Sequence, residues 1–540
     1  MLSQRTLILS AGFAAGFSGM TLELAAVRLL APYFGTSAYV WTNVIAVTLL
    51  ALAVGAWIGG RVADRGRAQR ALLAALLLGG VLSFLAPLLG PALAAELLPA
   101  DLRLEEAFSL LVSGSLLATL AVFGPPIALV GACSPLLVQR LVDAGSSVGR
   151  GSGGVYAIST LGSLLGTFGT THWFVPYLGS RSTVFLAGAS LFAAAGCLLL
   201  VRSRSGRSLA LALVLGTVPF AVAGLAPAAA ARALPDGWSR VGVERESIYQ
   251  CVRIIERNLG GKSERWLQVN DGLDSFQSLR EEGEIFTDTY YDPLAAMTLA
   301  TRPASGRCRV LILGLGGGTL VPLLRAIHAG AGQAIELVGV EIDPVVVELA
   351  QLHLGLDPRT IDIRADMDAR VALRALPGIW DAILVDAYAG QVHIPAHLCS
   401  REFFRELHER LSPGGIVALN VGALGPKDGV AGAIANTLAE SFGTAWRWPV
   451  PRNRNEIVFS TRAADVDFAA WAAALEAAGE QLDAASGTRA RTRVQELVAQ
   501  IGTLRCPVPH AFEPNGLILS DDDARIDVLQ MDALHASAGR

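Results

Sequence analysis

The chain has 540 residues, of which 52% are hydrophobic and 17% are charged, and its formal net charge is −4. This composition is too apolar for one soluble enzyme, so part of the chain is expected to lie in a lipid bilayer, and the length allows two or three domains. Residues 1–235 hold 14 arginines, no lysine and 7 acidic residues. Neither this region nor the acidic remainder has a basic face, so no nucleic-acid partner is expected.

Seven apolar stretches in the first 235 residues are each long enough to cross the hydrocarbon core of a membrane. Arginine-rich connections between them place the N-terminus on the cytoplasmic side by the positive-inside rule. The sequence therefore predicts a multi-span α-helical membrane domain of six to eight helices over residues 1–235. The stretches are 6–30, 40–60, 71–98, 107–139, 154–177, 182–201 and 208–228.

The last stretch decides on which side of the membrane the rest of the chain lies. Seven full crossings would place the C-terminal half outside, away from a cytosolic nucleoside. Residues 208–228 contain Pro219, and we expect this segment to be re-entrant or interfacial, with the C-terminal domain in the cytoplasm. The alternative is that all seven stretches cross and the chemistry is not cytosolic.

Two charged residues, Glu23 and Arg28, lie inside the first apolar stretch. Charges at membrane depth are costly and are therefore functional candidates. The alternative is that Arg28 reaches an interface while Glu23 pairs with it or caps a neighbouring helix.

The second half of the chain changes to a pattern of short strands. "SIYQCVRIIER" and "ERWLQVNDG" flank the turn "NLGGKS", which predicts a small β-hairpin subdomain over 236–290. Strands and helices alternate regularly over 291–460, which predicts an α/β Rossmann-like domain with a parallel sheet, of the class I methyltransferase type. Residues 461–540 are expected to form a helical C-terminal extension.

A glycine turn follows the first strand of this α/β domain in "LGLGGGT". Gly314, Gly316 and Gly318 let the backbone approach a ligand closely. Thr319 stands where the dinucleotide fingerprint has its third glycine, which favours a nucleoside without a pyrophosphate.

Three acidic residues follow the next strands in order. Glu341 is placed to accept the ribose hydroxyls, and Asp366 the adenine amino group; the alternatives are a solvated strand end and a helix N-cap. Asp386 ends the fourth strand at the cleft, with a structural salt bridge as its alternative. Together with "LSPGG" at 411–415, they predict a site for an S-adenosyl-type sulfonium nucleoside.

Over residues 240–460 the sequence resembles the spermidine synthase family of polyamine aminopropyltransferases, in its membrane-fused bacterial form. "SIYQCVRI", "VNDGLDSFQS", "DTYYDP", "VEID" and "IPAHLCSREFF" carry the resemblance. It implies that Gln250 contacts the nucleoside, that Asp271, Tyr290 and Tyr291 bind the amine substrate, and that the protein lies in the cell inner membrane. The implied co-substrate is decarboxylated S-adenosylmethionine, and no metal is required.

The sequence departs from the family pattern at two positions. Gly317 stands where the family has an Asp that holds the ammonium of the donor, and Ala389 where it has the Asp that deprotonates the attacking amine. Asp386 is then the candidate base, with Tyr388 lining the site.

Three functions stay open at this point: an aminopropyltransferase acting on an amine or polyamine, a methyltransferase using ordinary S-adenosylmethionine, and a transporter or sensor whose nucleoside domain only binds. The sequence also leaves open whether the protein forms a homodimer.

Three consecutive acidic residues lie near the C-terminus. Asp521, Asp522 and Asp523 form either a cation site for a polyamine or a solvated acidic turn.

Overall fold

The computed structural model describes most of the chain, and contacts divide it into two units. The first unit comprises Met1–Leu102, Ser109–Leu234 and Glu246–Cys251, and the second comprises Arg103–Phe108, Pro235–Arg245 and Val252–Arg540. The described residues are 4–98, 104–202, 234, 236–270, 276–301, 306–389, 393–422, 429–450, 454–463, 465–482, 486–504, 516–522, 525–526 and 528–530.

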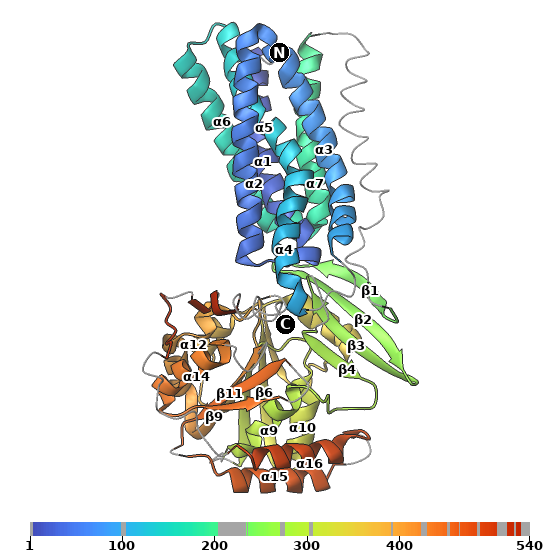
Figure 1. The fold of residues 1–540 in the computed structure, drawn as a ribbon, viewed down its shortest axis with the longest axis vertical. Coiled ribbons are helices and arrows are strands. Elements are labelled where there is room, and N and C mark those ends of the chain that lie inside the picture. The colour runs from blue at the N-terminus through green and yellow to red at the C-terminus, as the bar shows by residue number, and fades with distance from the viewer. Residues whose placement is uncertain are drawn as a thin grey trace. The chain divides into compact units, whose positions relative to one another are not determined.

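The first unit is a bundle of long apolar helices (Figure 1). Its described residues form four helical stretches that are long and apolar enough to cross a membrane. Two of these stretches are broken where Gly66 and Gly179 leave the helical conformation. The helices are α1 Gln4–Phe34, α2 Ala38–Val62, α3 Ala68–Leu97, α4 Leu104–Ala118, α5 Gly124–Asp143, α6 Val148–Gly169 and α7 Val175–Arg202.

The first six predicted apolar stretches are therefore helical. The seventh, 208–228, lies outside the described residues, so the number of crossings and the side of the C-terminal domain stay predictions. Arg28 of α1 donates a hydrogen bond of 2.6 Å to the carbonyl oxygen of Tyr249 and another to that of Ile248. Its guanidinium thus binds backbone carbonyls within the first unit.

Glycines bring the helices of this bundle into backbone contact. A Cβ atom on Gly16 of α1 would lie 2.0 Å from the carbonyl oxygen of Ser159 in α6, and one on Gly55 of α2 would lie 1.9 Å from that of Ala128 in α5. Small residues at helix interfaces allow this close approach in membranes. Any larger side chain at either position would force the helices apart.

The second unit contains two sheets. A seven-stranded sheet has the order β10-β11-β9-β8-β5-β6-β7, in which β11 is antiparallel to both of its neighbours and the remaining neighbouring strands are parallel. A four-stranded sheet has the order β1-β2-β3-β4, in which β3 is antiparallel to both β2 and β4. The strands are β1 Ser239–Glu246, β2 Cys251–Leu259, β3 Lys262–Val269, β4 Ser278–Glu281, β5 Arg307–Leu313, β6 Ala334–Glu341, β7 Asp362–Ala365, β8 Trp380–Val385, β9 Leu411–Gly422, β10 Trp446–Pro449 and β11 Asn455–Thr461.

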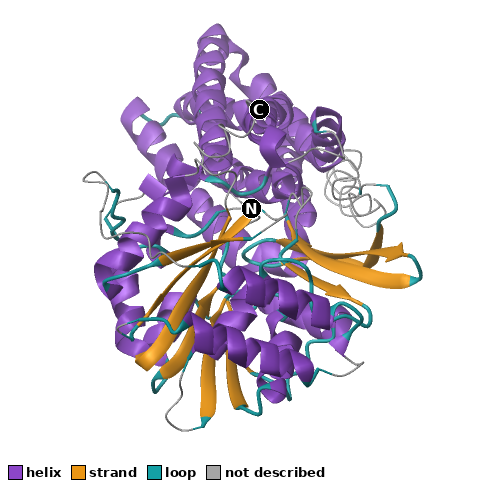
Figure 2. Ribbon diagram, turned by 60° about the horizontal axis from the view of Figure 1, so that its bottom comes forward, coloured by secondary structure: helices purple, strands orange, loops and turns teal. Residues whose placement is uncertain are grey.

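Alternating residues of each central strand face two separate cores. Val310 and Ile312 of β5 belong to a cluster with residues of α10, α15 and α16, whereas Leu311 and Leu313 belong to one with residues of α12, α13 and α14. Helices therefore cover both faces of the sheet (Figure 2), as the sequence predicted for this α/β domain. The helices are α9 Tyr291–Ala296, α10 Leu320–Gly330, α11 Pro344–Leu349, α12 Ala369–Ala375, α13 Arg401–Arg410, α14 Gly429–Phe442, α15 Phe468–Glu480 and α16 Ala490–Ile501.

Candidate active site

The glycine turn follows the carboxyl end of β5 and lies against the residues that follow β8. Gly314, Gly316 and Gly318 have φ angles of 92°, 53° and 78°, a region that side chains rarely allow. A Cβ atom on Gly314 would lie 2.3 Å from the carbonyl oxygen of Asp386. The first glycine is therefore required both by its conformation and by the neighbouring strand.

Glu341, the last residue of β6, holds this turn in place through hydrogen bonds to the backbone. One carboxylate oxygen accepts a hydrogen bond of 2.8 Å from the backbone N–H of Gly316, and the other accepts one of 3.1 Å from that of Asp343. Burial raises the pKa of Glu341 to about 7, against the effect of these hydrogen bonds. The backbone N–H of Ile342 also bonds this carboxylate, which leaves about one of its four lone-pair sites, so the ribose role predicted from the sequence remains chemically open to this side chain.

Asp386 follows β8 at the point where the strand order reverses around β5, which is where ligands bind in open α/β sheets. Its carboxylate accepts a hydrogen bond of 2.8 Å from the side-chain amide of Asn420 in β9. Burial raises the pKa of Asp386 to about 7, and the charge of Glu341 acts in the same direction, while hydrogen bonds from Asn420 and Tyr290 oppose the rise. A carboxyl group of this kind can exchange a proton near neutral pH.

Asn420 is a site residue that the motifs did not identify. Its amide oxygen accepts a hydrogen bond of 2.9 Å from the side chain of Asn455 in β11, so it is fixed on both sides. A buried polar residue within the apolar strand sequence "GGIVALNVG" was the signal that could have found it.

Three tyrosines surround this carboxylate in different ways. Tyr290 donates to Asp386, and its ring centroid lies 4.2 Å from that of Tyr291. The hydroxyl of Tyr291 donates to the carbonyl oxygen of Gln277 at 2.7 Å. The hydroxyl of Tyr388 donates to the carbonyl oxygen of Asn420 at 2.9 Å and accepts from a backbone N–H of β9 at 2.8 Å, so Tyr388 braces the end of β9.

The space beside Gly317 is filled by protein. A Cβ atom there would lie 2.5 Å from a methyl group of Leu354 and 2.7 Å from the Cβ of Ser278. The backbone N–H of Gly317 donates to the hydroxyl of Ser278 at 2.6 Å. The chain therefore has no room at this position for the donor-holding Asp that the resembling family carries.

The remaining predicted residues lie in different surroundings. Asp366 is exposed after β7, and Asp368 rather than Asp366 caps α12, because its carboxylate accepts from the N–H groups of Arg370 and Val371. Gln250 belongs to the segment Glu246–Cys251 of the first unit. Asp271 lies outside the described residues.

The predicted acidic segment near the C-terminus is partly engaged in an ion pair. Asp521 binds the guanidinium of Arg370 at 2.7 Å, and Asp523 lies outside the described residues. No group of three or more His, Cys, Asp or Glu side chains suited to a metal ion is found in the part of the chain that the structure describes.

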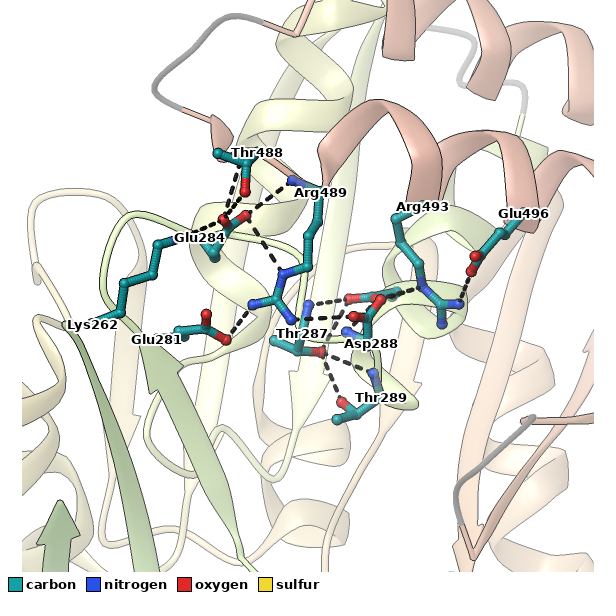
Figure 3. Close-up of polar contacts among 11 residues, drawn as sticks. Lys262, Glu281, Glu284, Thr287, Asp288, Thr289, Thr488, Arg489, Arg493 and Glu496 are labelled. Carbon is teal, nitrogen blue, oxygen red and sulfur yellow. Dashed lines mark hydrogen bonds and ion pairs between the residues drawn. The ribbon is translucent and has the colours of Figure 1, made fainter. Parts of the chain in front are cut away.

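A cluster of charged residues ties the segment before Tyr290 to the C-terminal extension (Figure 3). Burial alone would raise the pKa of Glu284, but hydrogen bonds from Lys262, Thr488 and Arg489 lower it to about 2. Next to Tyr291, the buried carboxylate of Asp292 binds the guanidinium of Arg493 in α16 at 2.8 Å. Helix α16 therefore holds the segment that positions both tyrosines.

The sheet order, the glycine turn and the acids at the strand ends define a Rossmann-like domain of the class I methyltransferase type. No protein-family model matches the chain. Over 302 residues the chain is 29% identical to a "Probable polyamine aminopropyl transferase" of Bifidobacterium longum, covering 55% of this chain and 64%, just under two thirds, of that protein.

A second relative extends the similarity. The "Polyamine aminopropyltransferase" of Mycobacterium tuberculosis is 27% identical over 441 residues, which covers 78% of each chain. This is more than residues 236–540 can hold, so the similarity reaches into the helical region. The crystal structure of a "probable spermidine synthase" from Corynebacterium glutamicum aligns with 52% of this chain and 97% of its own, at 17% identity and a TM-score of 0.38. The chain is a homologue of polyamine aminopropyltransferases, which confirms the resemblance in its sequence.

Proposed function

We propose that this protein is a membrane-tethered aminopropyltransferase that moves an aminopropyl group from decarboxylated S-adenosylmethionine to an amine. The observation that carries the proposal is the half-buried Asp386 carboxylate between Tyr290 and Asn420, at the strand ends beside the glycine turn. The names of the two curated relatives support the same reaction. The protein would lie in the cell inner membrane, with the α/β domain on the cytoplasmic side.

In this reaction the neutral amine attacks the carbon next to the sulfonium. A C–N bond forms as the C–S bond breaks, and the sulfur leaves as a neutral thioether. An alkylamine has a pKa of roughly 10 in water, so a carboxylate must take its proton. Asp386 would be this base, and the remaining contribution is orientation of the two substrates.

The other site residues would bind the two substrates. The backbone of Gly314, Gly316 and Gly318 would pack on the nucleoside, while Glu341, Asp366 and Gln250 would accept or donate hydrogen bonds to it. Tyr290, Tyr291 and Asp271 would line the pocket of the amine, and Tyr388 would keep β9 in place beside the base.

One observation favours a second candidate, methyl transfer from ordinary S-adenosylmethionine. The aminopropyl donor carries an ammonium group without a neighbouring carboxylate, and a protein carboxylate is its natural partner. Gly317 offers none, and Leu354 and Ser278 fill the space that such a side chain would need. An ordinary amino-acid tail, which brings its own carboxylate, depends less on that partner.

Product analysis separates the two candidates. The purified protein is incubated with decarboxylated or ordinary S-adenosylmethionine and a panel of di- and polyamines, and the products are identified by mass spectrometry. We expect an amine that has gained an aminopropyl group, formed only with the decarboxylated donor. A methylated product with the ordinary donor, or tight binding of either donor without any product, would overturn the proposal.

The raised pKa of the base predicts the pH dependence of this reaction. Asp386 must be deprotonated to accept a proton, and its pKa and that of Glu341 are both about 7. We therefore expect kcat/KM to fall about tenfold per pH unit as the pH drops below about 7, where an ordinary Asp would hold its activity to about pH 4. Initial rates between pH 4 and 9 check this, and a rate that stays constant from pH 7 down to pH 5 would contradict it.

A further inference from the structure

A partly open cavity lies between the helices α1, α2, α5 and α6 of the first unit. Its volume is about 180 Å³, more than ten times the roughly 10–15 Å³ that one water molecule requires. Most of its lining is glycine or apolar side chains. Four of its lining side chains are polar: Glu23, Ser134, Ser159 and Ser163.

The cavity is not the result of loose packing. A Cβ atom on Gly16 would lie 2.0 Å from the carbonyl oxygen of Ser159, and one on Gly131 would lie 2.5 Å from that of Leu52. The helices that form the walls are therefore in backbone contact at the edges of the cavity. A pocket left between helices that pack this closely is a built feature of the fold.

The polar side chains that line the cavity offer it hydrogen-bond acceptors rather than donors. Glu23 is half-buried, and none of the described residues forms a hydrogen bond or ion pair with its carboxylate. The hydroxyl of Ser159 donates a hydrogen bond of 3.0 Å to the carbonyl oxygen of Tyr156. The hydroxyl of Ser163 donates one of 3.3 Å to the carbonyl oxygen of Gly16. The lone pairs of both hydroxyl oxygens remain, so these residues offer the cavity a negative charge and hydrogen-bond acceptors.

We propose that this cavity binds a primary alkylammonium ion. An ammonium group supplies three N–H donors and one positive charge, which match the Glu23 carboxylate and the serine oxygens. Ala15, Leu52, Val130 and Leu137 supply an apolar wall for the alkyl chain. A carboxylate inside a membrane bundle is costly unless a partner neutralises it, and the bound ammonium is that partner. This inference rests on the cavity alone and does not depend on the transfer reaction.

Equilibrium binding tests the proposal. The full-length protein is placed in lipid nanodiscs, and binding of radiolabelled 1-aminobutane is measured for the wild type and for Glu23→Gln. Glutamine keeps the shape and removes an unpartnered charge, so the bundle is expected to fold. We expect the affinity of one site per chain to fall about tenfold or more in Glu23→Gln, because this variant loses a charge-assisted hydrogen bond to the ligand.

Matched variants make the result specific. Glu23→Asp should keep the site, Ser159→Ala should weaken it several-fold, and Asp143→Asn, which alters an exposed acid paired with Arg140 at the end of α5, should leave it unchanged. Unchanged stoichiometry and affinity in Glu23→Gln would overturn the proposal. Product formation, measured in parallel, should persist in Glu23→Gln, so failure of this site and failure of the proposed transfer are told apart.

Discussion

Asp386→Asn is expected to lower kcat by about 10²–10⁴-fold, the contribution of a positioned general base. The asparagine keeps the size of the side chain, and its amide oxygen can still accept the hydrogen bond from Asn420, which the wild-type carboxylate accepts at 2.8 Å. The nucleoside should therefore bind with nearly unchanged affinity. Single-turnover rates together with calorimetry of donor binding separate the loss of chemistry from a loss of binding.

Folding should not obscure this result. Because burial raises the folded-state pKa of Asp386 to about 7, this group favours the folded state when protonated, and that contribution is lost as the pH rises from about 4 to about 7. At pH 8 a neutral asparagine therefore costs no stability. Asp362→Asn, at an exposed acid of β7 paired with Arg364, is the matched control and should keep full activity. Unchanged turnover in Asp386→Asn would place the base elsewhere.

Arg493→Met is expected to be the most destabilising single change in the α/β unit. It leaves the carboxylate of Asp292, whose side chain is 0% exposed, without the guanidinium that binds it at 2.8 Å. Removing one partner of a buried ion pair costs about 3–5 kcal/mol, which corresponds to a fall in Tm of roughly 6–20 °C for a unit of this size. Thermal unfolding followed by tryptophan fluorescence measures it.

The consequence for function follows from the position of Asp292. It directly follows Tyr291, so activity should fall at temperatures where the fold is still intact. Arg364→Met breaks an exposed ion pair and should cost at most about 1 kcal/mol. Adding Asp292→Asn to Arg493→Met removes the unpaired charge and should restore part of the Tm. If Arg493→Met and Arg364→Met unfold at the same temperature, the buried pair does not stabilise this unit.

The order of the α/β elements could be predicted from the sequence because the patterns that encode it are local. "RVLILGLGGG", "AIELVGVEID" and "WDAILVDAY" are short apolar runs that end in glycines or an acid, and such runs form buried parallel strands. Acids at the carboxyl ends of those strands fall near one another whatever the detailed packing. Glu341 and Asp386 were found in this way, and their hydrogen-bond partners were not.

Those partners depend on which strands become neighbours. Asn420 reaches Asp386 only because β9 pairs with β8 in a register that sets Leu419 beside Val385. Likewise, Arg493 lies 201 residues along the chain from Asp292, a separation over which no local pattern carries information. Contacts of this kind are decided by the closure of the tertiary fold.

The sequence by itself therefore determined the apolar helices, the α/β alternation and the nucleoside-type glycine turn, since periodicity and spacing act over a few residues. Only the tertiary structure decided that Asp368 rather than Asp366 caps α12, that Tyr388 braces β9, and that Leu354 and Ser278 fill the space beside Gly317. The physical reason is that a side chain's role depends on the atoms packed around it, and segments distant in the sequence supply those atoms.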